Sequence, residues 1–218
     1  MGDRLLVINP NSSIDVTKGI DRAMTPLRSL TGPTIEVVRL EDGPPGIETQ
    51  QDVESVVPLI IRRVREENDA AAYVIACFSD PGLHAAREAT ERPVFGIAEC
   101  GILTALTLGG RFGLVSILRK VIPRHMRFLG AMGVLERFAG DRAIDLKVTE
   151  LADEKATLAR MAEVGAELRD RNGADVIVMA CAGMADHRAR LAEMLGIPVV
   201  EPTQAAVSMA LGRIALSW

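Results

Sequence analysis

Hydrophobic residues recur along this chain in short, unbroken runs rather than in alternation with polar residues. Runs that are apolar over their whole length are typical of strands buried on both faces, as in parallel sheets covered by helices. Amphipathic stretches separate the runs, so the pattern predicts successive β-α-β units. The expected strands are residues 4–9, 35–40, 72–77, 94–97, 111–116, 144–149, 176–181 and 198–201, and the clearest expected helices are 52–67, 123–138, 154–171 and 185–195.

The second half of the chain repeats the first. Around residue 77 the sequence reads AAYVIACFSDPGLHAAREATERPVFGI, and around residue 181 it reads ADVIVMACAGMADHRARLAEMLGIPVVEP. Each copy has an apolar run ending in Ala-Cys, a short turn, a helical segment with one histidine, and a proline before the next apolar run. Cys77 and Cys181 therefore occupy equivalent positions, and so do Asn9 and Ser116 at the ends of the first strand of each half.

Four strands per half predict an α/β protein of two pseudo-symmetric, flavodoxin-like halves, each with a parallel sheet. We expect one half over residues 1–105, closed by the C-terminal helix at 205–218, and the other over residues 106–204. Ligands of such sheets bind beyond the carboxyl ends of the strands. The expected active site is therefore the cleft between the halves.

The composition of the chain excludes several classes of function. Aromatic residues make up 3% of the 218 and the net charge is −4, which disfavours nucleic-acid binding. No run approaches the roughly 20 apolar residues of a membrane helix, and the first residues show no secretory signal. Three widely spaced cysteines without C-x-x-C or H-E-x-x-H motifs argue against disulfides and against a metal site. We expect a cytoplasmic protein that acts on a small molecule.

The paired thiols are the main candidate for chemistry. A lone buried cysteine usually behaves as a small hydrophobic residue, but Cys77 and Cys181 would present thiols to one cleft from opposite sides. That arrangement suits removal of a proton from one face of a carbon and delivery to the other face. Cys100 aligns with Ala205, so its role is expected to be structural.

The turns after the two cysteines predict the local electrostatics. Asp80 and Pro81 are typical of an N-cap and a first helical residue, so a helix is expected to begin just beyond Cys77. Free amides at that helix end are expected to lower the pKa of the thiol. After Cys181, the small residues Ala182 and Gly183 let the backbone approach a ligand closely.

Other polar residues are weaker candidates. The segment Asn-Pro-Asn-Ser-Ser at 9–13 suits a turn and helix cap, and we expect Asn9 and Ser12 or Ser13 also to contact a ligand. Two further histidines, His84 and His187, lie on helices that run away from the site. The remaining one, His125, is expected to be solvent-exposed, and the arginine-rich stretches 62–65 and 119–127 are expected to be solvated helix faces or subunit contacts.

Four motifs resemble one known family. The chain has Asn-Pro-Asn-Ser-Ser near its start, Gly-Pro-Pro-Gly-Ile-Glu at 43–48, Cys-Phe-Ser-Asp-Pro-Gly-Leu at 77–83 and Cys-Ala-Gly-Met at 181–184. With them it resembles the hydantoin and allantoin racemases of the aspartate/glutamate racemase superfamily, essentially from end to end.

The resemblance implies a two-base racemase without a cofactor, in which Cys77 and Cys181 act on opposite faces of the stereocentre. It further implies a pocket lined by Asn9, Ile47, Phe78, Ser79, Ser116 and the backbone of Ala182 and Gly183. Homo-oligomers are also expected from the resemblance, and the apolar C-terminal run at 205–216 supports them.

The expected substrate is a neutral 5-substituted hydantoin or an allantoin-like ureide, because the expected strand-end residues are uncharged. Three alternatives stay open at this point: an aspartate- or glutamate-type amino-acid racemase, an arylmalonate-type decarboxylase that needs one cysteine, and a ligand-binding module without catalysis.

Overall fold

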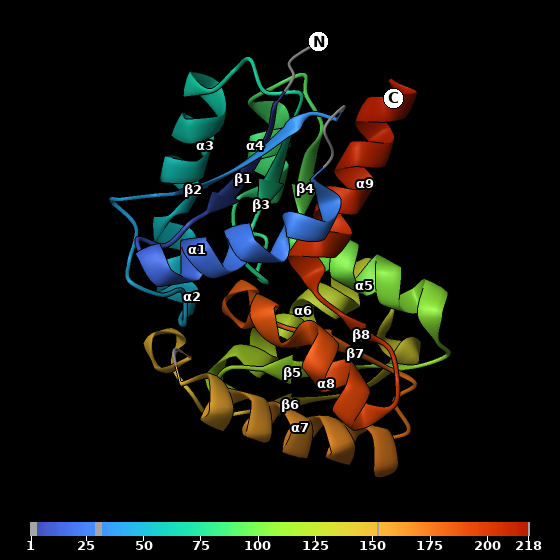
Figure 1. The fold of residues 1–218 in the computed structure, drawn as a ribbon. Coiled ribbons are helices and arrows are strands. Elements are labelled where there is room, and N and C mark those ends of the chain that lie inside the picture. The colour runs from blue at the N-terminus through green and yellow to red at the C-terminus, as the bar shows by residue number, and fades with distance from the viewer. Residues whose placement is uncertain (1–3, 29–31, 152, 218) are drawn as a thin grey trace.

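Two four-stranded parallel sheets form the framework of the protein (Figure 1). The computed structural model describes residues 4–28, 32–151 and 153–217. The strand order is β2-β1-β3-β4 in the first sheet and β6-β5-β7-β8 in the second, so the two sheets have the same topology and the expected pseudo-symmetric α/β fold is confirmed. The strands are β1 (Arg4–Asn9), β2 (Thr34–Arg39), β3 (Ala72–Ile75), β4 (Val94–Gly96), β5 (Phe112–Ser116), β6 (Phe138–Ala143), β7 (Val176–Met179) and β8 (Val199–Val200).

Helices cover both faces of each sheet, as the apolar strands require. The α-helices are α1 (Ile14–Ala23), α2 (Gln50–Ser55), α3 (Val57–Glu66), α4 (Leu83–Glu88), α5 (Ile97–Leu108), α6 (Ile122–Met132), α7 (Glu154–Asp170), α8 (Arg188–Leu195) and α9 (Pro202–Leu216). Short 3₁₀ helices are η1 (Thr25–Leu27), η2 (Arg119–Val121), η3 (Leu135–Arg137), η4 (Val148–Glu150) and η5 (Ala182–His187).

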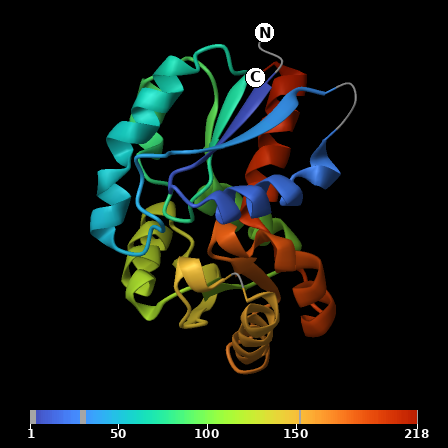
Figure 2. The same cartoon turned by 60° about the vertical axis from the view of Figure 1, so that its left-hand side comes forward.

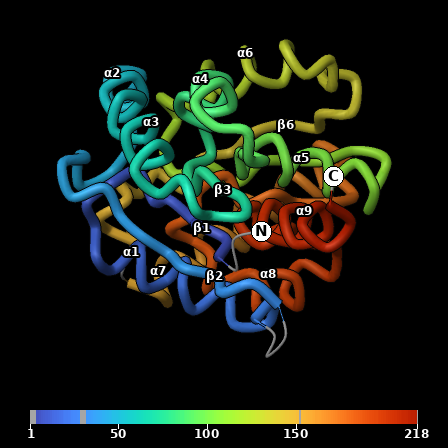
Figure 3. The backbone as a smooth tube through the Cα atoms, turned by 90° about the horizontal axis from the view of Figure 1, so that it is seen from above, coloured from blue at the N-terminus to red at the C-terminus, as the bar shows by residue number. Residues whose placement is uncertain are grey.

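The hydrophobic core has a central part shared by the halves and an outer part in each. In β1, Leu5 and Val7 face the shared core, whereas Leu6 and Ile8 face the outer core under α3 and α4. These two helices lie on the same side of the first sheet (Figure 3). Since successive strand residues point to opposite faces, a strand between two helical layers is apolar at every position.

The helices that follow the last strand of each sheet pack across the junction. Helix α5 contacts β7 of the second sheet, α9 contacts β3 of the first, and the two helices contact each other. Figure 2 shows α9 alongside the first sheet. Cys100, on α5, is buried in this shared core. The division into domains stays a prediction, and Trp218, at its C-terminal limit, lies outside the described residues.

Three elements expected from the sequence differ in the structure. The expected strand at 144–149 is a loop and η4, and the pairing strand is β6 at Phe138–Ala143, an edge strand that includes charged residues and gives no apolar run. Helix α6 ends at Gly133, whose φ of +71° stops it before the expected end at 138. The expected helix 52–67 is divided at Val56 into α2 and α3, with Pro58 in the first turn of α3.

Candidate active site

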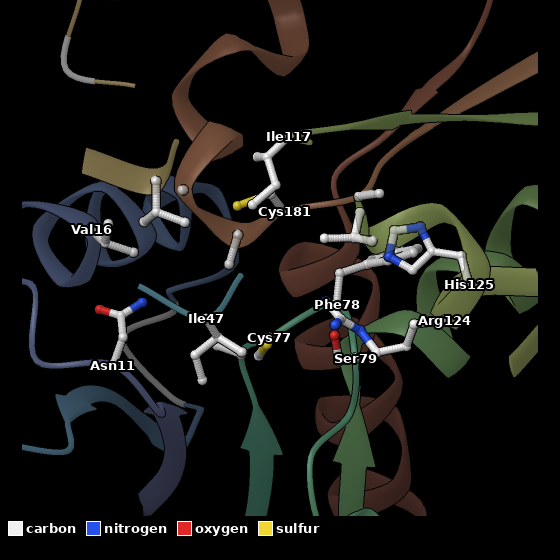
Figure 4. Close-up of a pocket in the computed structure, with 16 residues that line it drawn as sticks. Asn11, Val16, Ile47, Cys77, Phe78, Ser79, Ile117, Arg124, His125 and Cys181 are labelled. Carbon is white, nitrogen blue, oxygen red and sulfur yellow. The ribbon is translucent and has the colours of Figure 1, made fainter. Parts of the chain in front are cut away.

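A cavity lies where the carboxyl ends of the two sheets meet, and both Cys77 and Cys181 line it (Figure 4). It encloses about 460 Å³ of empty space, including the open solvent at its mouth. Segments that follow β1, β3, β5 and β7 all contribute to its wall. The lining residues are Asn11, Val16, Ile47, Ala76, Cys77, Phe78, Ser79, Ile117, Val121, Arg124, His125, Val148, Ala180, Cys181, Ala182 and Gly183.

The two thiols face this cavity from different halves of the molecule. Cys77 follows β3, and Cys181 is the residue before η5. Figure 4 shows their sulfur atoms on two sides of the space between Ile47 and Ile117. A charge on Cys77 raises the pKa of Cys181, so the two groups lie close enough to interact electrostatically.

The expected lowering of the thiol pKa values is wrong. Burial raises the pKa of Cys77 to about 11, although the amide and hydroxyl of Ser79 and the charge of Arg124 favour the thiolate. Burial likewise raises the pKa of Cys181 to about 12 against a hydrogen bond from the Gly183 amide. Loss of solvation outweighs these interactions. Both thiols are therefore protonated at neutral pH.

Asp80 does not cap the helix that follows Cys77. It adopts a φ of +43°, and α4 begins after Gly82. The Asp80 carboxylate instead accepts hydrogen bonds from the amides of Ala98 at 2.9 Å and Glu99 at 2.8 Å, in the first turn of α5. Burial raises the pKa of this carboxyl to about 7. Asp80 therefore ties the turn that carries Cys77 to the start of a different helix.

Asn9 stands behind the cavity and positions Asn11. Asn9 is fully buried, and its Nδ2 donates to Asn11 Oδ1 and to Thr17 Oγ1, both at 3.0 Å. The Ser13 amide also donates to Asn11 Oδ1, at 2.9 Å. With Oδ1 engaged twice, Nδ2 is the part of Asn11 left to donate into the cavity. Ser12 does not line the cavity, although its amide donates to Pro44 O at 3.0 Å.

Ser116 also stands behind the wall, where it belongs to a buried polar network. Its Oγ donates to Asp141 Oδ1 at 2.5 Å, and His125 Nδ1 lies 2.8 Å from Asp141 Oδ2. The expectation that His125 is solvent-exposed is wrong, since it is 4% exposed. Its ring meets Phe78 edge-on, with centroids 5.4 Å apart. Asp141 thus fixes the orientation of an imidazole in the wall of the cavity.

Arg124 also departs from expectation. The sequence predicts a solvated helix face or a subunit contact for the arginines in 119–127, but Arg124 lines the cavity from the first turn of α6. Burial lowers the pKa of this guanidinium, and its Nε is shielded from solvent with no hydrogen-bond partner among the described residues.

The structure brings together most of the expected site residues. Ile47, Phe78, Ser79, Ala182 and Gly183 line the cavity with the two cysteines, whereas Asn9, Ser12 and Ser116 do not. Asn11, Arg124 and His125 also line the cavity, although the sequence did not predict them there. Asn11 could have been found from its position two residues beyond a strand end. Arg124 and His125 could not have been found in this way, because no local sequence pattern shows how α6 is oriented toward the cavity.

The two weaker histidine candidates lie outside the lining of the cavity. His84 is exposed on α4, and His187 is buried beside a neighbouring surface hollow. Burial lowers the pKa of His187. Across the described residues, no cluster of histidine, cysteine, aspartate or glutamate is placed to hold a metal ion. None of the described helices combines the length and apolar character that a membrane crossing requires.

The family profile described as Asp/Glu/Hydantoin racemase matches residues 5–210. This chain belongs to that family. It is 36% identical over 219 residues to the hydantoin racemase of Paenarthrobacter aurescens, covering 99% of this chain and 92% of the relative. The allantoin racemase structure from Klebsiella pneumoniae has a TM-score of 0.90 at 32% identity, covering 98% of this chain and 88% of that one. The allantoin racemase from Pseudomonas fluorescens has a TM-score of 0.93 at 25% identity, covering 98% and 92%. This member of the racemase family is therefore an isomerase.

Proposed function

We propose that this racemase inverts the stereocentre of a 5-substituted hydantoin or an allantoin-like ureide, using Cys77 and Cys181 as the two proton-transfer groups and no cofactor. The observation that carries the proposal is that two free thiols from equivalent strand ends face one cavity. The names of the hydantoin and allantoin racemases that resemble this chain support the substrate class.

The chemistry requires one cysteine as thiolate and the other as thiol, so the reactive form is the small fraction of enzyme in which one of the two thiols has lost its proton. The thiolate removes the proton from the carbon next to the ring carbonyl, and the thiol delivers a proton to the opposite face. Each sulfur then carries the protonation state the other had before, so the enzyme is ready for the opposite enantiomer. The amides of Ser79 and Gly183, which bond to the sulfurs of Cys77 and Cys181, stabilise each thiolate as it forms.

The enolate formed between the two proton transfers needs a hydrogen-bond donor at its oxygen. Asn11 Nδ2 is the side-chain amide available for this in the wall of the cavity, held in place by Asn9. A donor already oriented before the reaction needs no rearrangement as negative charge develops on the oxygen. We assign the role of enolate stabilisation to Asn11 and a positioning role to Asn9.

Racemisation of enantiopure hydantoins, followed by polarimetry against the uncatalysed rate, tests the proposal. Cys77→Ser and Cys181→Ser should each abolish racemisation, whereas Cys100→Ser, in the shared core, should retain it. In deuterium oxide each single variant should still exchange the proton of one enantiomer, because one base still reaches one face. Full racemisation by either variant would rule out the two-base assignment.

A decarboxylase or a binding module makes different predictions in the same experiment. A decarboxylase that protonates through one cysteine should tolerate loss of Cys77, and a binding module should show no turnover. Aspartate and glutamate test the amino-acid alternative, and their turnover in place of hydantoins would overturn the substrate class.

We also propose that the enzyme works in the cytoplasm as a homo-oligomer. The mechanism requires free thiols, which a reducing compartment preserves. The C-terminal helix is covered by the chain itself as far as Ala210, but Leu216 at its end and Leu103 and Leu108 on α5 are 57%, 43% and 51% exposed. These leucines support an interface between copies.

A further inference from the structure

Arg124 carries a permanent charge in the cavity, and a neutral ring offers this guanidinium no charged group to bind. No carboxylate occurs among the residues that line this cavity. Among the described residues, none forms an ion pair or hydrogen bond with Arg124, whereas Arg119 on the neighbouring turn pairs with Asp145 at 3.1 Å. The wall of the cavity therefore carries uncompensated positive charge.

A partly desolvated guanidinium without a partner is unfavourable, and a negatively charged ligand in the cavity would relieve this cost. Within the protein, the charges that act on Arg124 favourably are those of the Cys77 thiolate and, less strongly, Asp52. Because burial raises the pKa of Cys77 to about 11, the thiolate is a rare species at neutral pH and does not neutralise Arg124 in the resting enzyme. Asp52 accepts hydrogen bonds from the amides of Glu48 and Thr49 rather than from Arg124, so a bound ligand is the remaining source of a negative charge in direct contact with this guanidinium.

The position of Arg124 indicates which part of a ligand it reaches. In Figure 4 its side chain extends toward Ser79, on the side of Cys77 opposite Asn11. Ser79 and Arg124 also line a surface hollow next to the cavity, together with Arg127 and with the carboxyl groups of Glu54 and Asp80. A ring held between the cysteines with its carbonyl toward Asn11 leaves a flexible 5-substituent free to extend toward Arg124 and this hollow.

We propose that Arg124 binds a carboxylate on the 5-substituent, so that the enzyme prefers hydantoins or related ureides with an acidic side chain. This inference rests on the proposed function and names its substrate class. The planar guanidinium can donate two parallel hydrogen bonds to a carboxylate, and its positive charge attracts the anion into the cavity. The ring itself remains neutral, and the negative charge of such a ligand lies on its 5-substituent.

Two hydantoins of nearly equal shape test the inference: 5-(2-carboxyethyl)hydantoin and its neutral amide, 5-(2-carbamoylethyl)hydantoin. The wild-type enzyme should have the higher kcat/KM for the acid. Arg124→Gln should lower kcat/KM for the acid about 10- to 100-fold more than for the amide, the usual range for a hydrogen bond to a charged group. The amide should lose only the support that the charge of Arg124 gives the Cys77 thiolate. Arg119→Gln, at an exposed site outside the cavity, is the matched control.

Equal losses for acid and amide, with a higher pH needed for activity, would overturn the inference and show that Arg124 acts only through the Cys77 thiolate. Binding measured by calorimetry separates a failure of this inference from a failure of the proposed function. If neither compound is racemised, tighter binding of the acid that Arg124→Gln abolishes would still support the carboxylate site. Equal binding of acid and amide would overturn it, whatever the turnover.

Discussion

Replacement of Asp80 by asparagine should change how the stability of the enzyme depends on pH. The pKa of this buried carboxyl is about 7 in the folded protein and 3.8 in an unfolded chain. Between these values the folded protein holds a proton that the unfolded chain releases, so stability falls as the pH rises from about 4 to about 7. A difference of about 3 pKa units at about 1.36 kcal/mol each sets an upper limit of about 4 kcal/mol on this contribution.

The measurement is urea unfolding of the wild type and of Asp80→Asn across this pH range, followed by circular dichroism. Because asparagine does not titrate, the free energy of unfolding of the wild type should fall relative to that of the variant as the pH rises from about 4 to about 7. Asp52→Asn is a control of opposite sign. Although burial acts to raise it, the pKa of Asp52 is lowered by hydrogen bonds from the amides of Thr49 and Glu48, so that carboxylate stabilises the fold at neutral pH and loses this effect in acid. Parallel curves for wild type and Asp80→Asn would refute the reasoning.

Three further predictions concern packing, thiol reactivity and assembly. A Cβ at residue 96 would lie 2.3 Å from the Asp80 carboxylate, so Gly96→Ala should cost about 1–3 kcal/mol and lower the Tm; an unchanged Tm would contradict the close approach. With pKa values of about 11 and 12, Cys77 and Cys181 should react with iodoacetamide at pH 8 at least about two orders of magnitude more slowly than in the unfolded chain, where the thiol pKa is about 8.5. Equal rates, measured by mass spectrometry, would argue against buried protonated thiols. Light scattering should give a multiple of 23.4 kDa, and the monomer mass would mean that the exposed Leu216 contributes to no interface between copies.

Much of the site could be predicted because strand ends are predictable. Cys77 and Cys181 each end an unbroken apolar run, and in a parallel sheet the carboxyl ends of neighbouring strands meet at one edge. The internal repeat then placed one thiol in each half. The prediction is less accurate one or two residues beyond each strand. There, side chains no longer point alternately to the two faces of the sheet, and the turn sets their direction. For this reason the sequence favoured Asn9 for ligand contact, whereas Asn11 lines the cavity.

The protonation of the thiols could not be predicted from the motif. An aspartate followed by proline ordinarily begins a helix, and free amides at such an end would favour a thiolate. In the fold, Asp80 instead caps α5, which begins 17 residues later in the chain at Ile97, and burial dominates the pKa of Cys77. Solvation depends on everything packed around a group, and no local sequence pattern records it.

The sequence by itself determined the two repeated halves, the order of apolar strands, and the pair of cysteines, because each depends on short-range patterns of polarity. The tertiary structure alone decided which side chains complete the cavity wall. Arg124 and His125 lie on a helix of the second half, and they reach the site only because α6 packs with its first turn toward Phe78 and Ser79 of the first half. The packing of the two halves thus places the charge of Arg124, which selects the substrate in our proposal, beside residues that lie far from it in the chain.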